Sequence, residues 1–211
     1  TSDPRLKEIM SSFIQCLHRF LREVEPTQDE WFEAIQFLTE IGQKCSDKRQ
    51  EFILMSDTLG VSMLIDAINN RKIDGATESS VLGPYYRASA PELEHGASIN
   101  MTNEGDLLEV HGLVSDQYHN PINGAILDIW QTAPNGLYDV QDDKQPDMNL
   151  RGKIRTGRDG QYFFRTVRPA SYPIPTDGPV GKMMSALGWH PNRPAHMHFI
   201  VSANGYKPVT T

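Results

Sequence analysis

Residues 193–203 read RPAHMHFIVSA and place His196 and His198 two positions apart within an apolar run. In an extended strand, side chains alternate between faces, so both imidazoles point the same way, with their Cα atoms about 6.5–7 Å apart. Imidazole is the commonest metal ligand among side chains, and a same-face pair can bind one ion. Two histidines hydrogen-bonded inside a β-sandwich are the simpler alternative, which the pair alone does not exclude.

The surrounding half of the chain has the rhythm of short strands. Stretches of nearly alternating apolar and polar residues recur at 107–116, 125–133, 160–169 and 195–203. Turn signals separate them, among them Asn123-Gly124, Asp159-Gly160 and Asn204-Gly205. This pattern predicts a β-sandwich with long loops over residues 77–211. Because the sequence stops early in another apparent strand, we expect a C-terminal part of this domain to be missing.

The first third has a helical period instead. Apolar residues at three- and four-residue steps predict an amphipathic helix over 5–24. Thr27 and Glu30 form the pattern of a capping box that opens a second helix, and Ser46 is placed to cap a third helix that ends before Gly75. Three such helices have little core of their own, so we expect residues 1–76 to pack on the second half or on another subunit. The fold class is therefore mainly β with a helical N-terminal region.

Composition narrows the classes of partner. The 211 residues carry a net charge of −7 with no basic block, which argues against nucleic acid and against an anionic membrane surface. No apolar run is long enough to insert into a membrane, and no signal-peptide pattern opens the sequence. Cys16 and Cys45 are the only cysteines, and both fall in helix-like sequence, which favours buried free thiols and a cytoplasmic location.

A metal site needs more ligands than one histidine pair. Asp128 and Asp139 are the carboxylates to consider for a two-histidine, one-carboxylate iron site, and His111 and His119 flank the first hairpin. No spacing among them stands out.

Two tyrosines stand out more clearly. Tyr138 in NGLYDVQ and Tyr172 in RPASYPIPTDGPVG each lie in a loop rich in glycine or proline, where function tends to be carried on a rigid scaffold. A tyrosine beside proline is by default a packing residue. Tyrosinate ligation requires a strong Lewis acid such as ferric iron, because the free phenol loses its proton only near pH ~10.

The run NLRGKIRTGRDGQYFFRTVRPASYPIPTDGPVGKMMSALGWHPNRPAHMHF, residues 149–199, resembles the core of the intradiol ring-cleaving dioxygenases. ESSVLGPYYR at 78–87 and the helical N-terminal region resemble the catechol and hydroxyquinol branch of that family. The resemblance implies a β-sandwich catalytic domain and an N-terminal helical linker that forms a homodimer. In this branch the helical interface often binds a phospholipid.

The resemblance also implies a mononuclear Fe(III) centre with hydroxide as a fifth ligand. Its protein ligands would be Tyr138, Tyr172, His196 and His198. Tyr172 would leave the metal and act as an internal base when an aromatic diol binds before reaction with O₂. Arg193 would stabilise negative charge on the substrate ring, although a regular strand would place it on the face opposite His196, and a surface salt bridge is its simpler role. A further polar residue of the family site would lie beyond residue 211.

The pocket segments most resemble those of members that cleave hydroxyquinol, 1,2,4-trihydroxybenzene, to 3-hydroxy-cis,cis-muconate. Asp57 is the physical discriminator, because a buried third hydroxyl needs an acceptor, although the carboxylate could equally brace its own helix. Catechol or chlorocatechol is the alternative substrate. The expected substrate-binding residues are Leu54, Asp57, Val81, Leu82, Gly83, Pro84, Tyr85, Ile174, Pro175 and Arg193.

Two functions of other classes compete with this interpretation. A non-catalytic β-sandwich binding module fused to a helical dimerising segment would keep the fold without the chemistry. An extradiol dioxygenase would need Fe(II) and a carboxylate ligand, which the tyrosines argue against.

Overall fold

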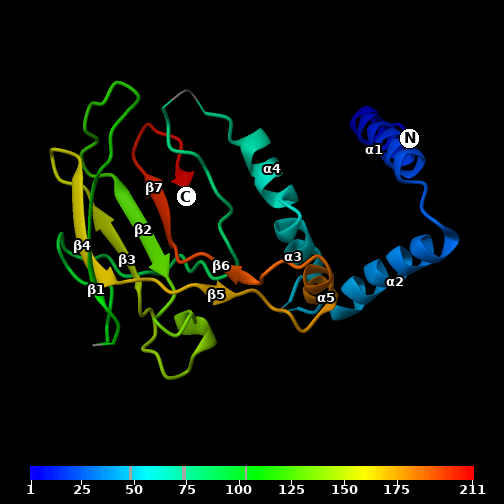
Figure 1. The fold of residues 1–211 in the computed structure, drawn as a ribbon. Helices are drawn as coiled ribbons and strands as arrows, with labels where there is room; N and C mark the ends of the chain where they lie inside the picture. The colour runs from blue at the N-terminus through cyan, green and yellow to red at the C-terminus, as the bar shows by residue number, and fades with distance from the viewer. Residues whose placement is uncertain (48, 73–74, 103) are drawn as a thin grey trace. The chain divides into compact units, whose positions relative to one another are not determined.

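The structure is a computed structural model that describes residues 1–47, 49–72, 75–102 and 104–211 (Figure 1). The chain divides into two compact units, Thr1–Phe52 and Ile53–Thr211, and each is described by itself.

Two long helices make up most of the first unit. Helix α1 spans Pro4–Val24 and begins at Asp3, whose carboxylate accepts hydrogen bonds from the backbone of Arg5 and Leu6. Helix α2 spans Gln28–Lys44 and begins with the predicted capping box, because Thr27 accepts from the Glu30 amide while the Glu30 carboxylate accepts from the Thr27 amide. Both helices confirm the periodicity of the sequence. Cys16 and Cys45 are free thiols, and Cys16 is exposed rather than buried.

The third predicted helix is wrong in two respects. The helix begins at Glu51 rather than directly after Ser46, whose backbone exchanges hydrogen bonds with that of Arg49 in the preceding loop. The helix is also two helices, α3 over Glu51–Thr58 and α4 over Val61–Asn69. Gly60 separates them with a φ of 74°, a left-handed conformation that glycine adopts without the steric cost of a Cβ. Apolar periodicity continues across this break, so the pattern alone could not place it.

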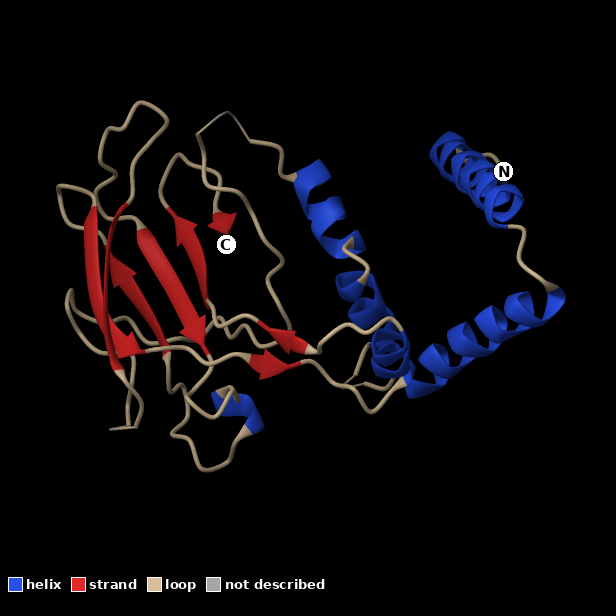
Figure 2. Cartoon of the chain, viewed as in Figure 1, coloured by secondary structure: helices blue, strands red, loops and turns tan. Residues whose placement is uncertain are grey.

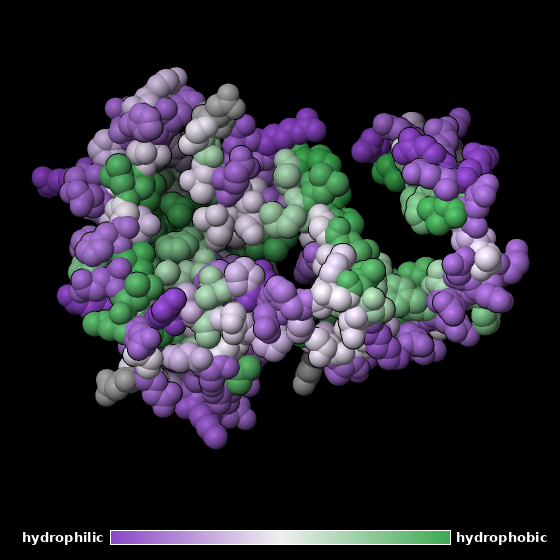
Figure 3. All heavy atoms as spheres, in the orientation of Figure 1, coloured by the Kyte–Doolittle hydropathy of each residue, from purple (hydrophilic) through white to green (hydrophobic). Residues whose placement is uncertain are grey.

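The apolar stripes of these helices are exposed in the single chain. Phe13 and Trp31 keep more than half of their surface accessible, as does Leu64 in the second unit, and apolar residues gather visibly on α1, α2 and α4 in Figure 3. None of the helices in the described ranges is both long and apolar enough to cross a bilayer. An exposed face of this kind marks an interaction site.

The second unit contains the β-sandwich that the sequence predicts, shown as two layers of strands in Figure 2. One layer pairs two strands antiparallel, β1 (Leu107–Leu113) and β4 (Gln161–Val167). The other has the order β3-β2-β7-β8, with β3 at Arg151–Arg155, β2 at Ile126–Gln131, β7 at Met197–Ser202 and β8 at Val209–Thr210. The remaining elements are 3₁₀ turn η1 (Asp139–Gln141), the β5 (Tyr172–Pro173) and β6 (Asn192–Arg193) ribbon, and helix α5 (Pro179–Ala186).

The hydrophobic core lies between the two layers. Leu127 and Ile129 from β2 and Ile154 from β3 face Phe164 and Val167 from β4. Alternation along a strand then turns the intervening residues of β2, β3 and β7 to the outer face of the four-stranded sheet. That outer face carries the candidate site.

Two elements have no clear signal in the sequence. Strand β3 reads RGKIR, and its charged residues mask a pattern in which Gly152 and Ile154 face the core. Helix α5 is short and begins at Pro179 within a stretch rich in glycine and proline. Such composition is typical of loops, and local packing decides the conformation instead.

Gly160 lies in the turn between β3 and β4, where its backbone packs closely against neighbouring residues. Its φ is 73°, and a Cβ there would lie 2.6 Å from the Val114 carbonyl oxygen and 2.9 Å from Pro121. Gly124 has a similar φ of 70° but open space around it. We expect Gly124→Ala to cost about 1–2 kcal/mol of unfolding free energy from the left-handed backbone alone, and Gly160→Ala to cost more. Urea denaturation of both variants measures the difference, and equal losses would contradict the close approach.

Candidate metal centre

The histidine pair lies at the start of β7. His198 pairs with Trp130 of β2, and the two rings stack 4.7 Å apart at an interplanar angle of 1°. His196 comes immediately before the strand, where its Nδ1 lies 2.7 Å from the Pro194 carbonyl oxygen. A carbonyl can only accept, so Nδ1 carries the proton and Nε2 presents a lone pair, the arrangement usual for a metal-binding histidine.

The two Nε2 atoms point at each other across 3.2 Å. Two nitrogens bound to one ion at about 2.0–2.1 Å, with an angle of about 90–105° between the bonds, would be separated by about the same distance. The same-face prediction for His196 and His198 is therefore correct, and their nitrogens converge on one point.

Tyr172 lies against His196, and Tyr138 lies against Tyr172. The Tyr138 ring is 6.0 Å from the Tyr172 ring, which in turn is 5.6 Å from the His196 ring, all between centroids. The loop carrying Tyr138 approaches closely, since a Cβ on Gly136 (φ 80°) would lie 3.1 Å from the Tyr172 Cβ. Two phenol oxygens and two imidazole nitrogens thus come from three separate segments of the chain.

Arg193 is brought to the site by the β5–β6 ribbon. Its register pairs Tyr172 with Arg193, and the guanidinium Nη1 donates a 3.0 Å hydrogen bond to the Tyr172 hydroxyl. A regular strand would have placed Arg193 on the face opposite His196. Strand β6 instead ends at Arg193, and the chain is irregular through Pro194 before β7 begins, so both residues reach Tyr172.

Burial sets the protonation states of the donor groups. Burial together with the neighbouring His196 lowers the pKa of His198 to about 4, and burial also lowers the pKa of His196. Burial and the adjacent Tyr172 hydroxyl raise the pKa of Tyr138 far above the ordinary value of a phenol. Without a metal the site therefore holds neutral imidazoles and a neutral Tyr138 phenol at neutral pH, and only a strong Lewis acid would displace the phenolic proton.

The candidate carboxylates are engaged elsewhere. Asp128 accepts a 3.0 Å hydrogen bond from Tyr86 and lies 3.7 Å from the Lys153 ammonium. Asp139 forms ion pairs with Arg87 and Arg151. Among the described residues, no cluster of three or more histidine, cysteine or acidic side chains is arranged around a common point. The donor set is therefore two phenols and two imidazoles, which suits ferric iron far better than calcium, magnesium or zinc.

His111 and His119 lie away from this set. His111 stacks on Phe163 at 4.4 Å, and His119 occupies a turn with a φ of 64°.

The segment at 81–85 lines the same place. A Cβ on Gly83 would lie in ordinary contact with the His198 ring, 3.5 Å from Cε1, and the φ of 76° is the feature that favours glycine there. Tyr85 stacks on Tyr138 at 4.6 Å, and its hydroxyl accepts a 2.8 Å hydrogen bond from Gln141. Of the flanking positions, Val81 is half-buried whereas Leu82 and Pro84 are exposed.

The remaining predicted pocket residues have fewer contacts that connect them to the four donors. Ile174 follows the β5 ribbon and donates its amide to the Pro191 carbonyl, while Pro175 is exposed. Leu54 is half-buried on α3 and Asp57 is exposed there. Within the described ranges, neither an ion pair nor a side-chain hydrogen bond connects Asp57 to the four donors.

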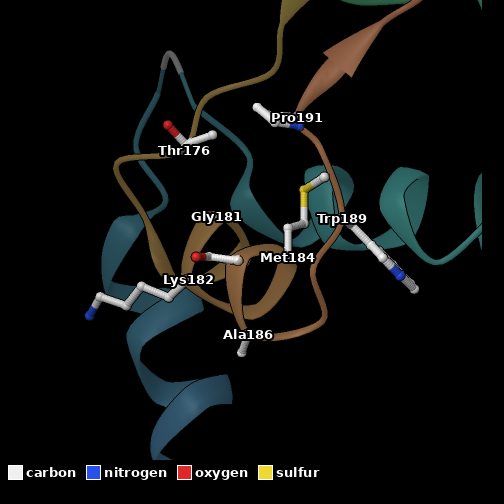
Figure 4. Close-up of a pocket in the computed structure, with 8 residues that line it drawn as sticks. Thr176, Gly181, Lys182, Met184, Ala186, Trp189 and Pro191 are labelled. Atoms are coloured by element: carbon white, nitrogen blue, oxygen red, sulfur yellow. The ribbon is translucent and has the colours of Figure 1, made fainter.

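A separate hollow of about 680 Å³ lies along α5, where Met184 and Trp189 line it together with Thr176 and Pro191 (Figure 4). None of its lining residues is one of the four donors. It lies at the far end of the β5–β6 ribbon, since Pro191 accepts the amide hydrogen bond of Ile174.

Sequence reasoning missed Trp130, which stacks on His198, and Arg151, which lies over the Tyr138 ring. A signal existed in β2, where Asp128 and Trp130 alternate with the core residues Leu127 and Ile129. A tryptophan and a carboxylate on the second face of a buried strand indicate that this face is covered and carries polar chemistry.

Comparison with known proteins fits the geometry. The family model described as "Dioxygenase" matches residues 81–211, and the model described as "Catechol dioxygenase N terminus" matches residues 3–77. The chain belongs to the intradiol ring-cleavage dioxygenase family. Members of this family depend on non-haem iron, and the two-phenol, two-imidazole set fits that requirement.

Intradiol dioxygenases named for different substrates are similar to this chain. Hydroxyquinol 1,2-dioxygenase of Rhizobium sp. (strain MTP-10005) is 54% identical, over 99% of this chain and 71% of the relative. 6-chlorohydroxyquinol 1,2-dioxygenase of Cupriavidus pinatubonensis is 45% identical, over 100% of this chain and 76% of the relative.

Solved intradiol structures superpose closely. Hydroxyquinol 1,2-dioxygenase from Pseudomonas putida DLL-E4 matches with a TM-score of 0.97 at 50% identity, covering 100% of this chain and 74% of the other. Catechol 1,2-dioxygenase from Acinetobacter sp. ADP1 matches with a TM-score of 0.80 at 32% identity, covering 99% and 69%.

The histidine pair predicts a pH dependence for the metal-free chain. A histidine in the unfolded chain takes a proton near its ordinary pKa of 6.5, whereas folded His198 does so only near 4. The unfolding free energy should therefore be fully present above pH 6.5 and decline as the pH falls towards 4, by on the order of 3 kcal/mol from His198.

Urea denaturation between pH 7 and pH 5 measures this slope. His198→Gln should flatten it, whereas the same change at His18, exposed on α1, should not. Equal slopes in the two variants would contradict the assigned burial of a neutral imidazole.

Proposed function

We propose that this chain cleaves hydroxyquinol in the intradiol manner, with a ferric ion held by Tyr138, Tyr172, His196 and His198. Both atoms of O₂ enter the product, and the ring carbon–carbon bond between the two adjacent hydroxyl-bearing carbons breaks. The observation that carries the proposal is the convergence of the His196 and His198 Nε2 atoms at 3.2 Å beside two phenols.

Charge balance explains why these donors suit a buried ferric site. Two neutral imidazoles add no charge, and two tyrosinates with one hydroxide neutralise the three positive charges of the ion. A neutral site avoids the large cost of burying net charge. When bound, the ferric ion would supply Lewis acidity and withdraw electron density from the chelated diol.

Tyr172 is suited to take a substrate proton. It lies on a strand of only two residues and is half-buried, and its hydroxyl is already hydrogen-bonded to Arg193. Its phenolate oxygen would accept one of the two protons that the diol loses and the hydroxide would accept the other, so that the site stays neutral when the diol binds as a dianion. Arg193 remains beside it and can stabilise negative charge on the substrate ring.

Substrate preference rests on the α3 residue Asp57 and on the relatives. The relatives with 54% and 45% identity carry hydroxyquinol or chlorohydroxyquinol in their names. A carboxylate at Asp57 would accept a hydrogen bond from the third ring hydroxyl, and a site built for a hydroxyl discriminates strongly against an analogue without it.

The exposed apolar faces of α1, α2 and α4 support a homodimer formed through residues 1–76, with the catalytic domain in residues 77–211. A phospholipid in an apolar tunnel between the helices would cover the same faces. The cytoplasm is the proposed location, since both cysteines are free thiols.

Iron binding tests the site directly. We expect the chain loaded with Fe(III) to show a visible tyrosinate-to-iron charge-transfer band. Loss of a supporting partner weakens metal binding about 10–100-fold, so His198→Ala, which removes a ligand, should weaken it by more than about 100-fold. Chelator competition measures this change. His111→Ala is the matched control and should keep both iron and colour, and a colourless wild-type chain would refute the proposal.

Steady-state kinetics test the substrate assignment. We expect Asp57→Ala to lower the ratio of kcat/KM for hydroxyquinol to kcat/KM for catechol about 10–100-fold, since a charged hydrogen bond is lost. Asp57→Asn keeps an acceptor and should retain most of the ratio. A ratio unchanged in Asp57→Ala, or a wild type that prefers catechol, would show the assignment to be wrong.

A further inference from the structure

Two residues that are level with His198 in the sheet, Trp130 and Arg151, contact proposed ligands of the candidate centre. The strand registers align Arg151 of β3 with Trp130 of β2, and Trp130 with His198 of β7. Directly opposed residues share one face of a sheet, here the outer face that carries the site. Trp130 stacks on His198, and the Arg151 guanidinium carbon lies 5.9 Å from the centre of the Tyr138 ring, above its face. Each thus contacts one of the proposed ligands.

Arg151 is a buried charge with one main partner. Its side chain is 1% exposed, and so is that of Asp139. Nε donates a 2.7 Å hydrogen bond to Asp139 Oδ1, and Nη2 lies 2.5 Å from the same oxygen. Nη1 and Nη2 are both buried without a hydrogen-bond acceptor among the described residues, so the Nη2 contact with Asp139 is an ion pair only. Such a pair is costly to bury, and apolar residues often stabilise a fold as well or better. Stability alone therefore explains it poorly.

The ion pair fixes the backbone beside a proposed ligand. Asp139 directly follows Tyr138 in the chain, and its second oxygen accepts from Arg87 at 2.7 Å and from the Met148 amide at 3.1 Å. Three hydrogen-bond donors thus hold one carboxylate, and with it the peptide that carries the Tyr138 ring.

The segment that delivers Arg151 is strained. Met148 and Leu150 have φ values of 62° and 59°, in the left-handed region that is costly for residues with a Cβ. Each such residue costs of order 1–3 kcal/mol and persists where the surroundings impose it. Buried Asn149 between them donates to Gln145 and accepts from the Met101 amide. The strained backbone at Met148 and Leu150 therefore lies directly before Arg151, the residue that contacts the Tyr138 ring.

The two tyrosines differ in how firmly they are held. Tyr138 is 1% exposed, stacked by Tyr85 and backed by Arg151, whereas Tyr172 lies half-buried on a two-residue strand and bonds to Arg193. We propose that Arg151 is a positioning residue that holds Tyr138 in place as the permanent phenolate ligand, so that Tyr172 alone is free to leave. This inference rests on the proposed ferric centre.

Two matched lysine variants test it. Arg151 and Arg87 bind the same Asp139 carboxylate, but only Arg151 lies over the Tyr138 ring. Lysine keeps the positive charge but has a single nitrogen in place of the planar guanidinium group. It therefore cannot contact Asp139 through two nitrogens while also covering the Tyr138 ring. We expect Arg151→Lys to weaken Fe(III) binding about 10–100-fold, as loss of a partner of a ligand does, and Arg87→Lys, which leaves the contact over the Tyr138 ring in place, to weaken it far less. Chelator competition measures both.

A spectrum separates positioning from general destabilisation. In a Tyr172→Phe background the charge-transfer band comes from Tyr138 alone, and Arg151→Lys should shift its maximum whereas Arg87→Lys should not. If Arg151→Lys matches Arg87→Lys in iron affinity and band position, whatever the change in Tm, the inference is overturned. A wild-type chain that binds no iron would refute the ferric centre itself, and the role of Arg151 with it.

Discussion

The antiparallel pairing of β2 with β7 is the constraint on which the site depends. It places His198 opposite Trp130 and turns both rings to the outer face of the sheet, where they stack in parallel. The same register sends Leu127 and Ile129 into the core. A shift of one residue would exchange the two faces completely. The hydrophobic core therefore fixes the position of His198, a proposed metal ligand, although the core residues lie on the opposite face of the sheet.

Loops bring the remaining donors to that fixed point, and each is held by a different local interaction. The turn at Gly136 carries Tyr138 against Tyr172, and the ribbon of β5 and β6 pairs Tyr172 with Arg193. The 81–85 segment also contacts these donors, because Gly83 approaches His198 and Tyr85 stacks on Tyr138. The sheet carries His198, while loops carry both tyrosines, of which Tyr138 is buried and Tyr172 is half-buried.

Much of the fold was predictable because its signals are local. The helical periods of α1 and α2, the Thr27 capping box and the alternation in β1, β2, β4 and β7 all lie within short windows. The break at Gly60, the charged strand β3 and helix α5 were not, because tertiary packing decides them. The same-face argument for His196 and His198 worked for the same local reason. Convergence of Tyr138 and Tyr172 depends on loop geometry, and the resemblance to a family supplied it. The role of Arg151 became visible only through the register of the sheet, whereas Trp130 had a signal in the alternation of β2.

Strand β2 divides its side chains between two tasks by position. Leu127 and Ile129 serve the core, while Asp128 and Trp130 serve the outer face. Substitutions at adjacent positions of one strand therefore have different consequences. Those on the core face affect folding, and those on the outer face affect chemistry. A pocket lined from the outer face can diversify without disturbing the core, which is how one scaffold can accommodate diols that differ by a hydroxyl or a chlorine.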